Sequence, residues 1–137
     1  MRIRILLALL IVSTAQASDW VSLGKGHNGN LEMFADVSNI RATGPVKRAW
    51  VKAVYAPFTS RGAGQRASKW ESESLELIAF NCQEQVERME AITTYYTDGT
   101  LYTVSASSFP LAWEAAVPDT VMASEMDFIC LWKANAG

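Results

Sequence analysis

Apolar and polar residues alternate over long stretches in the middle of the chain. In residues 46–56, Ala49, Val51 and Ala53 occupy every second position, and polar side chains such as Lys52 lie between them. A spacing of two is typical of a strand that buries one face. Residues 69–82 repeat this pattern and predict a second long strand.

The second of these predicted strands carries a cysteine at its end. Ile78, Phe80 and Cys82 fall on the same face of the strand. Because the two neighbours of Cys82 on that face are apolar, we expect its sulfur to point into the hydrophobic core.

Shorter strands are predicted on both sides of this pair. Residues 20–23 and 31–36 flank a turn rich in glycine and asparagine. Asp98-Gly99 is typical of a tight hairpin turn, and residues 101–106 are predicted to return as the partner strand.

Residues 83–97 permit two readings. The spacing of Val86, Met89 and Glu90 fits a helix, whereas the β-branched and aromatic run at 92–96 favours a strand.

The hydrophobic spacing changes near the C-terminus. Pro118, Asp119 and Thr120 form a typical helix start, with a capping side chain next to a proline. The apolar residues that follow recur at helical spacing and predict one buried stripe, made of Met122, Met126, Ile129 and Cys130. For the two methionines, packing in the core is favoured over a ligand surface.

The first 17 residues have the layout of a cleavable signal peptide. Two arginines precede a short apolar run, and Ala15-Gln16-Ala17 provides the small residues read at a cleavage site. The run is too short for a membrane anchor, which needs about 20 apolar residues. We therefore predict a signal peptide at 1–17 and one folded domain at 18–137, in the periplasm, secreted or at the cell surface. No cysteine directly follows the apolar run to carry a lipid anchor.

Composition narrows the classes of partner. Without Arg2 and Arg4, ten Lys and Arg residues remain against fourteen Asp and Glu, so the predicted mature chain is mildly acidic. Nucleic acid is therefore not an expected partner. After the signal peptide, no segment has the length and hydrophobicity of a transmembrane span. The sequence leaves the oligomeric state open.

The chain has two cysteines, Cys82 and Cys130. In an oxidising compartment an even number favours pairing, and two cysteines permit one intramolecular bond. Two buried thiols and half of a metal site are the alternatives. Zinc usually needs four ligands at short paired spacings, which this sequence lacks, so we predict a disulfide that ties the helix to the sheet and no metal site.

Motifs in a fixed order resemble a known family. An aromatic residue precedes Asp36 and Val37-Ser38-Asn39-Ile40, and a strand containing Trp50 follows. Next come Asn81-Cys82 and the hairpin at 95–100. The order ends with Trp113, Val117-Pro118 and Cys130.

Together these features resemble the surface-adhesin protein E family of Gram-negative bacteria, over about residues 20 to 132. The resemblance implies an α+β fold: a single antiparallel sheet of about six strands, with a C-terminal helix packed on its concave face and tied by the disulfide. It also implies a binding protein that contacts host extracellular matrix proteins.

Candidate catalytic chemistry is sparse. His27, the single histidine, lies among glycines and asparagines and is interpreted as an exposed turn residue. Glu84, Glu87 and Glu90 recur every three residues; a solvated acidic face is favoured over a cation site. The sequence contains no nucleophile elbow, P-loop or paired cysteine motif, and no cofactor is predicted.

One segment suggests a binding surface. Arg61, Arg66 and Lys69 follow Pro57, without an acidic residue before Trp70. Such a segment is suited to an anionic envelope polymer or an acidic protein surface. Further cations would extend this patch if the sheet brings them near: Arg41, Lys47 and Arg48. An ordinary connecting loop is the alternative.

Two classes of function remain. The first is an exported, non-catalytic binding protein of the bacterial periplasm or cell surface, which the missing catalytic motifs and the resemblance favour. The second is an envelope enzyme or inhibitor with a site that the sequence does not reveal.

Overall fold

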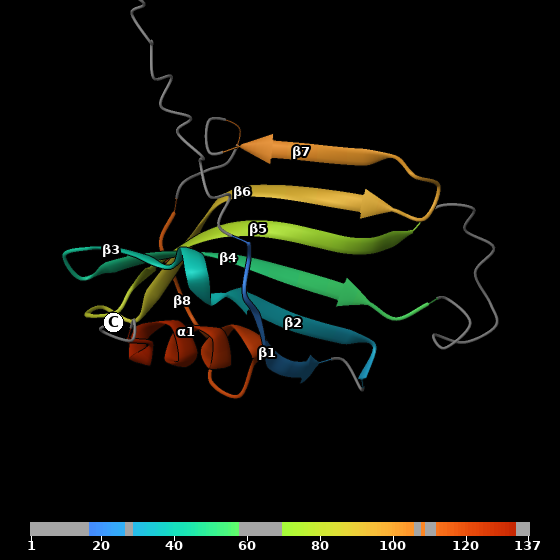
Figure 1. Ribbon diagram of the computed structural model, residues 1–137. Coiled ribbons are helices and arrows are strands. Elements are labelled where there is room, and N and C mark those ends of the chain that lie inside the picture. Colours follow the sequence, from blue (N-terminus) through green and yellow to red (C-terminus); the bar gives the residue numbers. More distant parts are fainter. Residues whose placement is uncertain (1–16, 27–28, 58–69, 106–107, 109–111, 134–137) are drawn as a thin grey trace, which may run out of the picture.

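The protein is built on one antiparallel sheet with one α-helix packed against it (Figure 1). The computed structural model describes residues 17–26, 29–57, 70–105, 108 and 112–133. The strands and the helix are β1 (Trp20–Gly26), β2 (Leu31–Asp36), β3 (Arg41–Thr43), β4 (Val46–Tyr55), β5 (Glu71–Asn81), β6 (Val86–Tyr96), β7 (Leu101–Ser105), β8 (Glu114–Ala115) and α1 (Val121–Leu131).

Six strands form the main path of the sheet, in the order β1-β2-β4-β5-β6-β7. The two short strands pair at one end, β3 with β4 and β8 with β6. All pairs are antiparallel, and each strand of the main path pairs with the next one along it. This confirms the predicted α+β fold.

The predicted long strands are confirmed as β4 and β5. They pair in continuous register from Val46 opposite Asn81 to Val54 opposite Glu73. The ambiguous segment at 83–97 is a strand, β6, so the β-branched and aromatic run outweighs the helical spacing.

The hairpin predicted at Asp98-Gly99 is confirmed. Gly99 has a φ of 83°, which glycine adopts without strain, and its amide donates to the Tyr96 carbonyl. The Asp98 carboxylate accepts hydrogen bonds from the Thr100 amide and hydroxyl.

The first strand is longer than predicted. The sequence predicts a strand at 20–23, but β1 continues to Gly26. Leu23 is an extra residue in the pairing with β2, and Gly24 beside it has a φ of 117°, so a bulge at this point lets the strand continue.

The hydrophobic core lies between α1 and one face of the sheet, here called the inner face. Ala49, Val51 and Ala53 line it from β4, as the alternation predicts, and Ile78 and Phe80 line it from β5. Met126 and Ile129 of α1 are fully buried against these residues. The small side chains of β4 let the helix approach the sheet closely.

The N-terminal part of α1 lies close to β1. A Cβ atom added at Gly26 would meet Cγ2 of Val121 at 2.8 Å. Glycine is therefore needed where β1 passes the first residue of the helix. Thr120 caps the helix by accepting a hydrogen bond from the Ala123 amide, which confirms the predicted helix start.

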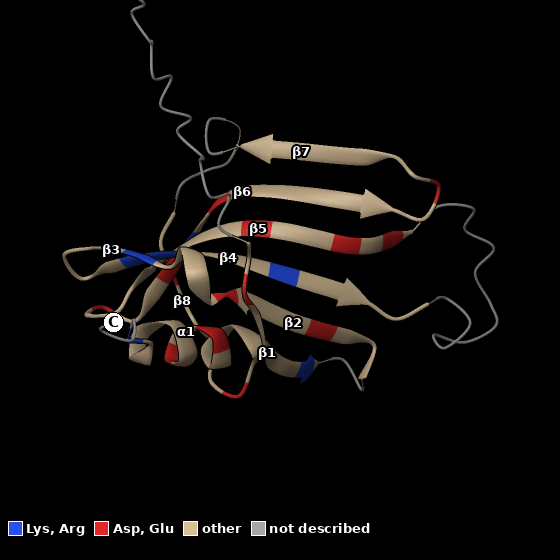
Figure 2. Ribbon diagram, in the orientation of Figure 1, with Lys and Arg blue, Asp and Glu red and all other residues tan. Residues whose placement is uncertain are grey.

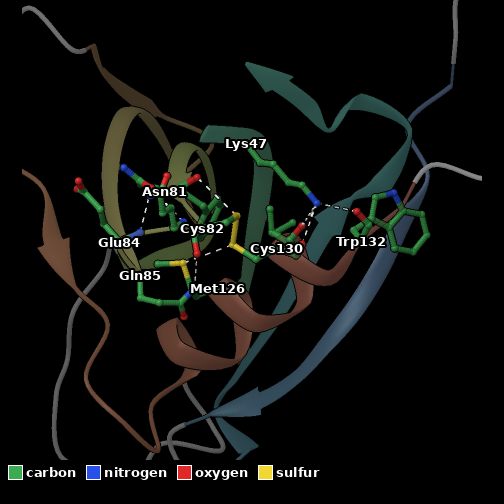
Figure 3. The surroundings of a disulfide bond; sticks show 11 residues. Lys47, Asn81, Cys82, Glu84, Gln85, Met126, Cys130 and Trp132 are labelled. Carbon is green, nitrogen blue, oxygen red and sulfur yellow. Dashed lines mark hydrogen bonds between the residues drawn. A yellow bond between two sulfur atoms is a disulfide. The ribbon is translucent and has the colours of Figure 1, made fainter. Parts of the chain in front are cut away.

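Two contacts hold the C-terminal end of α1 to the sheet (Figure 3). The predicted disulfide between Cys82 and Cys130 is confirmed, and it joins positions 48 residues apart. The Lys47 ammonium donates to the carbonyl oxygens of Ile129, Cys130 and Trp132 at 3.0, 2.9 and 2.6 Å. These are orphan carbonyls of a helix terminus, where a cation is also favoured by the helix dipole.

Asp36, the last residue of β2, has a structural role. Its carboxylate accepts from the Asp19 and Ser38 amides, the Ser38 hydroxyl and the Asn39 side chain. Burial opposes ionisation, but these hydrogen bonds outweigh it and lower the pKa of Asp36 below its usual value.

No helix within the described ranges has the length and apolar character needed to cross a membrane.

Candidate functional site

The residues predicted to bind a partner lie outside the described part of the chain. Arg61, Arg66 and Lys69 belong to residues 58–69. His27, interpreted above as an exposed turn residue, also lies outside the described residues. In the sequence, residues 58–69 lie between β4, which ends at Tyr55, and β5, which begins at Glu71.

The cations expected to extend that patch have structural partners instead. Lys47 is directed toward the helix carbonyls. Arg48 forms an ion pair with Glu90 at 3.0 Å on the opposite, outer face of the sheet. Arg41 lies opposite Arg48 in the β3–β4 pair, and its guanidinium donates to backbone carbonyls nearby. The three side chains therefore do not form one free cationic surface.

Other cations on the outer face lie over aromatic rings. The Lys52 ammonium is 4.5 Å from the Trp20 ring centroid and 5.4 Å from that of Phe34. Arg88 lies 4.4 Å from the Trp113 ring and also pairs with Glu90. These contacts hold the positive charges to the sheet.

The acidic residues behave differently from the predicted solvated face. Figure 2 shows acidic positions on β5, β6 and α1. Glu84 is exposed in the turn before β6, and Glu90 forms its ion pairs on the outer face. Glu87 is 7% exposed and lies on the inner face. The expected single solvated face is therefore wrong, because β6 separates these three carboxyls.

Strand alternation explains why Glu87 and Glu90 point to opposite faces, because residues three apart in a strand have opposite orientations. Ile78 of β5 pairs with Met89, while Leu77 pairs with Ala91, so Glu90 is an extra residue in β6. Alternation leaves Glu87 and Met89 on the inner face with Ile78 and puts Glu90 beside Arg48, and the bulge changes only the orientation of the residues that follow Glu90.

Glu87 lines a cavity of about 590 Å³ between the N-terminal half of α1 and the inner face. Three more carboxyl residues line it: Glu76 from β5, Glu125 from α1, and Asp119, which precedes the helix. Most of the remaining wall is apolar and comes from Leu31, Met33, Ile78, Met89, Val121 and Met122. A concave, largely apolar cavity with a few converging polar groups is the usual form of a ligand site.

Two of the three glutamates in this cavity have an unpartnered oxygen. Glu125 is 2% exposed, and its Oε1 atom is buried without a hydrogen bond; the same holds for Oε2 of Glu87. Glu76 accepts a hydrogen bond from the Ser74 hydroxyl at 2.9 Å. A buried carboxyl without partners destabilises a fold, so these oxygens need an explanation.

Burial and mutual repulsion shift the protonation of this carboxyl cluster, which we define as Glu76, Glu87 and Glu125. Burial raises the pKa of Glu125 to about 8, and Glu87 and Glu76 add to the rise. Burial, Glu76 and Glu114 raise the pKa of Glu87 to about 7. Burial also raises the pKa of Glu76, against the Ser74 hydrogen bond and with a contribution from Glu71. Near neutral pH the cluster therefore holds protons that an exposed glutamate would release.

Met122 and Met126 differ in how deeply they are buried. Met126 is 1% exposed and packs in the core, as predicted, whereas Met122 is 38% exposed and lines the cavity. Met122 is therefore a correction to the predicted buried stripe. Met122 lies over the cavity, so part of its side chain remains uncovered by the sheet.

The sequence did not reveal the carboxyl cluster. Its members lie on three separate elements, and Glu125 stands in the helix beside the apolar stripe. A charged residue next to Met126 on a helix of apolar character was the one available signal.

The structure is an α+β domain in which a disulfide fixes a C-terminal helix on an antiparallel sheet. The chain matches the surface-adhesin protein E family over residues 20–131, nearly the entire folded part, and it belongs to that family. It is therefore a surface-adhesin-like protein. No curated protein and no solved structure matches the chain significantly.

Proposed function

We propose that this chain is an exported, non-catalytic adhesin that binds the acidic surface of a host extracellular matrix protein through Arg61, Arg66 and Lys69. The observation that carries the proposal is the family match across residues 20–131. The family's description names a surface adhesin, and adhesion requires a recognition surface rather than a reaction centre.

The distribution of charge supports this choice of residues. Lys47, Arg48, Lys52 and Arg88 are held by carbonyls, Glu90 or aromatic rings. Residues 58–69 carry three cations and no acid in an acidic chain. Exposed cations attract an anionic partner over about a Debye length, ~8 Å at physiological salt.

Export is part of the proposal. The Cys82–Cys130 disulfide supports it, since such bonds persist in oxidising compartments. Intact mass of the exported protein should correspond to a chain that begins at Ser18 or within a residue or two of it. A mass that retains residues 1–17, or that includes a lipid, would count against this part.

Binding is tested with the protein recovered after export and a solubilised matrix preparation on a sensor surface. The triple variant Arg61→Ser, Arg66→Ser, Lys69→Ser should bind about tenfold more weakly, mainly through a slower association rate. The matched control removes three exposed cations elsewhere: Lys25→Ser, Arg41→Ser, Lys133→Ser. This control should retain most of the binding, because its charges lie outside the proposed surface.

Two further results decide between the alternatives. Heparin, as an anionic polymer, is measured in parallel; binding to heparin with none to matrix proteins would redirect the proposal to an envelope polymer. His27→Ala should leave binding unchanged. If the triple variant binds normally while His27→Ala abolishes binding or an activity, the proposed surface is wrong and an envelope enzyme takes its place.

A further inference from the structure

The cavity under α1 contains buried carboxyl oxygens that no described protein group satisfies. Oε1 of Glu125 and Oε2 of Glu87 are buried and unpartnered, and both residues are more than nine-tenths buried. Buried polar atoms in folded proteins almost always have a hydrogen-bond partner. Two unpartnered carboxyl oxygens in one cavity therefore point to a ligand group that enters from outside.

Charged side chains surround the cavity on several elements, whereas β2 lines it with apolar residues alone. Glu76 of β5 and Glu125 of α1 face Glu87 of β6, and Glu114 of β8 lies directly opposite Glu87 in the strand pair. Asp119 lines the cavity before the helix begins, and Lys25 of β1 is exposed at its rim. Among the described lining residues Lys25 is the one basic side chain, against four acidic ones, so the cavity favours positive charge.

The remaining walls indicate the shape of the ligand. Leu31, Met33, Ile78, Met89 and Met122 give the cavity aliphatic and thioether surfaces. Methionine side chains adapt to flexible aliphatic chains. A volume of about 590 Å³ lies in the range of small-molecule sites.

We propose that this cavity binds an organic cation, with an ammonium or guanidinium head on the carboxyl cluster and an aliphatic stem along the methionine-lined wall. The head supplies the hydrogen-bond donors that Glu87 and Glu125 lack. The stem covers apolar surface that the helix leaves open. This inference is independent of the proposed adhesion through residues 58–69.

A bare metal ion fits the cavity less well than an organic cation. No group of three or more His, Cys, Asp or Glu side chains among the described residues is arranged to hold a metal ion. An ammonium head has three N–H donors and a guanidinium head five, so either can donate to more than one carboxyl at hydrogen-bond distance, which is longer than a metal–ligand bond.

Binding by this site should release protons. The pKa values of Glu87 and Glu125 are raised to about 7 and about 8, so both carboxyls are largely protonated at pH 6. An ammonium ion with a pKa near that of lysine, about 10.4, stays charged throughout this range. Pairing requires ionised carboxylates, so affinity should rise with pH.

The test uses hexylammonium and hexylguanidinium as probes, and hexan-1-ol as the uncharged control of equal length. Calorimetry with the exported, oxidised protein should give binding for both cations, with an affinity about tenfold higher at pH 8.5 than at pH 6. Titration in two buffers of different ionisation enthalpy should show proton release. Equal binding of hexan-1-ol, or an affinity independent of pH, would overturn the proposal.

Variants locate the head group. Glu125→Gln and Glu87→Gln should each lower the affinity for hexylammonium about tenfold and reduce proton release, because each removes one carboxylate. Glu84→Gln removes the same charge from an exposed turn and should change neither value. Both cavity variants keep the side-chain shape, and near-ultraviolet circular dichroism verifies their fold. If both bind like the wild type, the site is wrong.

The same chemistry occurs in free amines and in the side chains of lysine and arginine. A peptide with one central lysine is therefore compared with its norleucine counterpart. Stronger binding of hexylammonium than of the lysine peptide assigns a small-molecule ligand, and the reverse assigns a basic segment of a protein. Binding of neither cation overturns the inference, and none of these results depends on matrix binding through Arg61, Arg66 and Lys69.

Discussion

The two ends of α1 contact the same sheet in different ways. At the C-terminal end, Cys130 is bonded to Cys82, and Lys47 donates to three terminal carbonyls. At the other end, Glu125 lies over the sheet with an unpartnered oxygen, next to a cavity. One end has covalent and charge-assisted contacts, whereas the other buries carboxyls without compensation.

This difference separates stability from recognition within one helix. A disulfide and a charge-assisted clamp stabilise the fold, so the opposite end can retain groups that are unfavourable when nothing is bound. We therefore expect the contacts at the C-terminal end of α1 to contribute strongly to the free energy of unfolding, and bound ligands to change that contribution little. The end of α1 next to the carboxyl cluster should respond to pH and to bound cations.

The largest effect is expected from removing the disulfide. Replacing both Cys82 and Cys130 by Ser should lower the free energy of unfolding by about 4 kcal/mol, as expected for closing a loop of this length. Urea unfolding of the oxidised wild type and of the variant measures the difference. Reducing agent should destabilise the wild type alone, and a wild type that is unaffected by reduction would show that the bond contributes little.

The next effect concerns the Lys47 clamp. Lys47→Met removes the ammonium from three carbonyls and should lower the free energy of unfolding by about 2 kcal/mol. Hydrogen exchange of the Trp132 amide should become faster, since it bonds to the Phe128 carbonyl in the last turn. Lys25→Met, at an exposed position near the opposite end of α1, is the control and should change little. Equal stability of both variants would argue against the clamp.

Removing the Glu125 carboxyl, in the N-terminal half of α1, should have a smaller effect of opposite sign and increase the free energy of unfolding. The folded pKa of Glu125 is raised from 4.5 to about 8, so the folded state binds its proton more tightly than the unfolded state. The stability of the wild type should therefore fall as pH rises from about 4.5 to about 8.

Glu125→Gln removes this loss and should raise the free energy of unfolding by about 1–2 kcal/mol at pH 8.5, with little change at pH 4.5. Urea unfolding at the two pH values measures it. Glu84→Gln provides the exposed control. A variant that is less stable than the wild type at pH 8.5 would mean that the carboxylate has a partner in the folded protein.

The smallest effect is expected from the cations at 58–69. The triple change to Ser at Arg61, Arg66 and Lys69 should shift the free energy of unfolding by less than about 1 kcal/mol in total, because many exposed charges contribute nothing measurable to stability. Thermal unfolding at physiological salt measures this. A large loss of stability would place these side chains in the fold and remove them from the proposed binding surface.

Much of the fold was accessible from the sequence. Alternation predicted β4 and β5 because each strand buries a face made of Ala49, Val51, Ile78 and Phe80, and such a face requires a period of two. The turn at Asp98-Gly99 followed from local conformational preference. Cys82 and Cys130 could be paired because only one intramolecular bond was available.

The candidate site was accessible only in part. The spacing of Glu84, Glu87 and Glu90 suggested one solvated face, but residues 86–96 form a strand, in which positions three apart point to opposite faces, so Glu87 is directed inward and Glu90 toward Arg48. The local sequence permitted both a helix and a strand, and therefore did not decide which of these glutamates is buried.

The sequence by itself determined five strands of the main path and the helix, most of the apolar faces and which cysteines pair, because these depend on short-range spacing and on count. It left β6 undecided and did not predict β3 or β8. Tertiary structure alone decided that Glu76, Glu87 and Glu125 share a cavity and that Lys47 binds the helix end. Those contacts join elements distant in sequence, and their geometry depends on strand register and on how closely α1 packs on the sheet. The protonation of the cluster has the same origin, since burial and repulsion arise only once the three carboxyls are brought together.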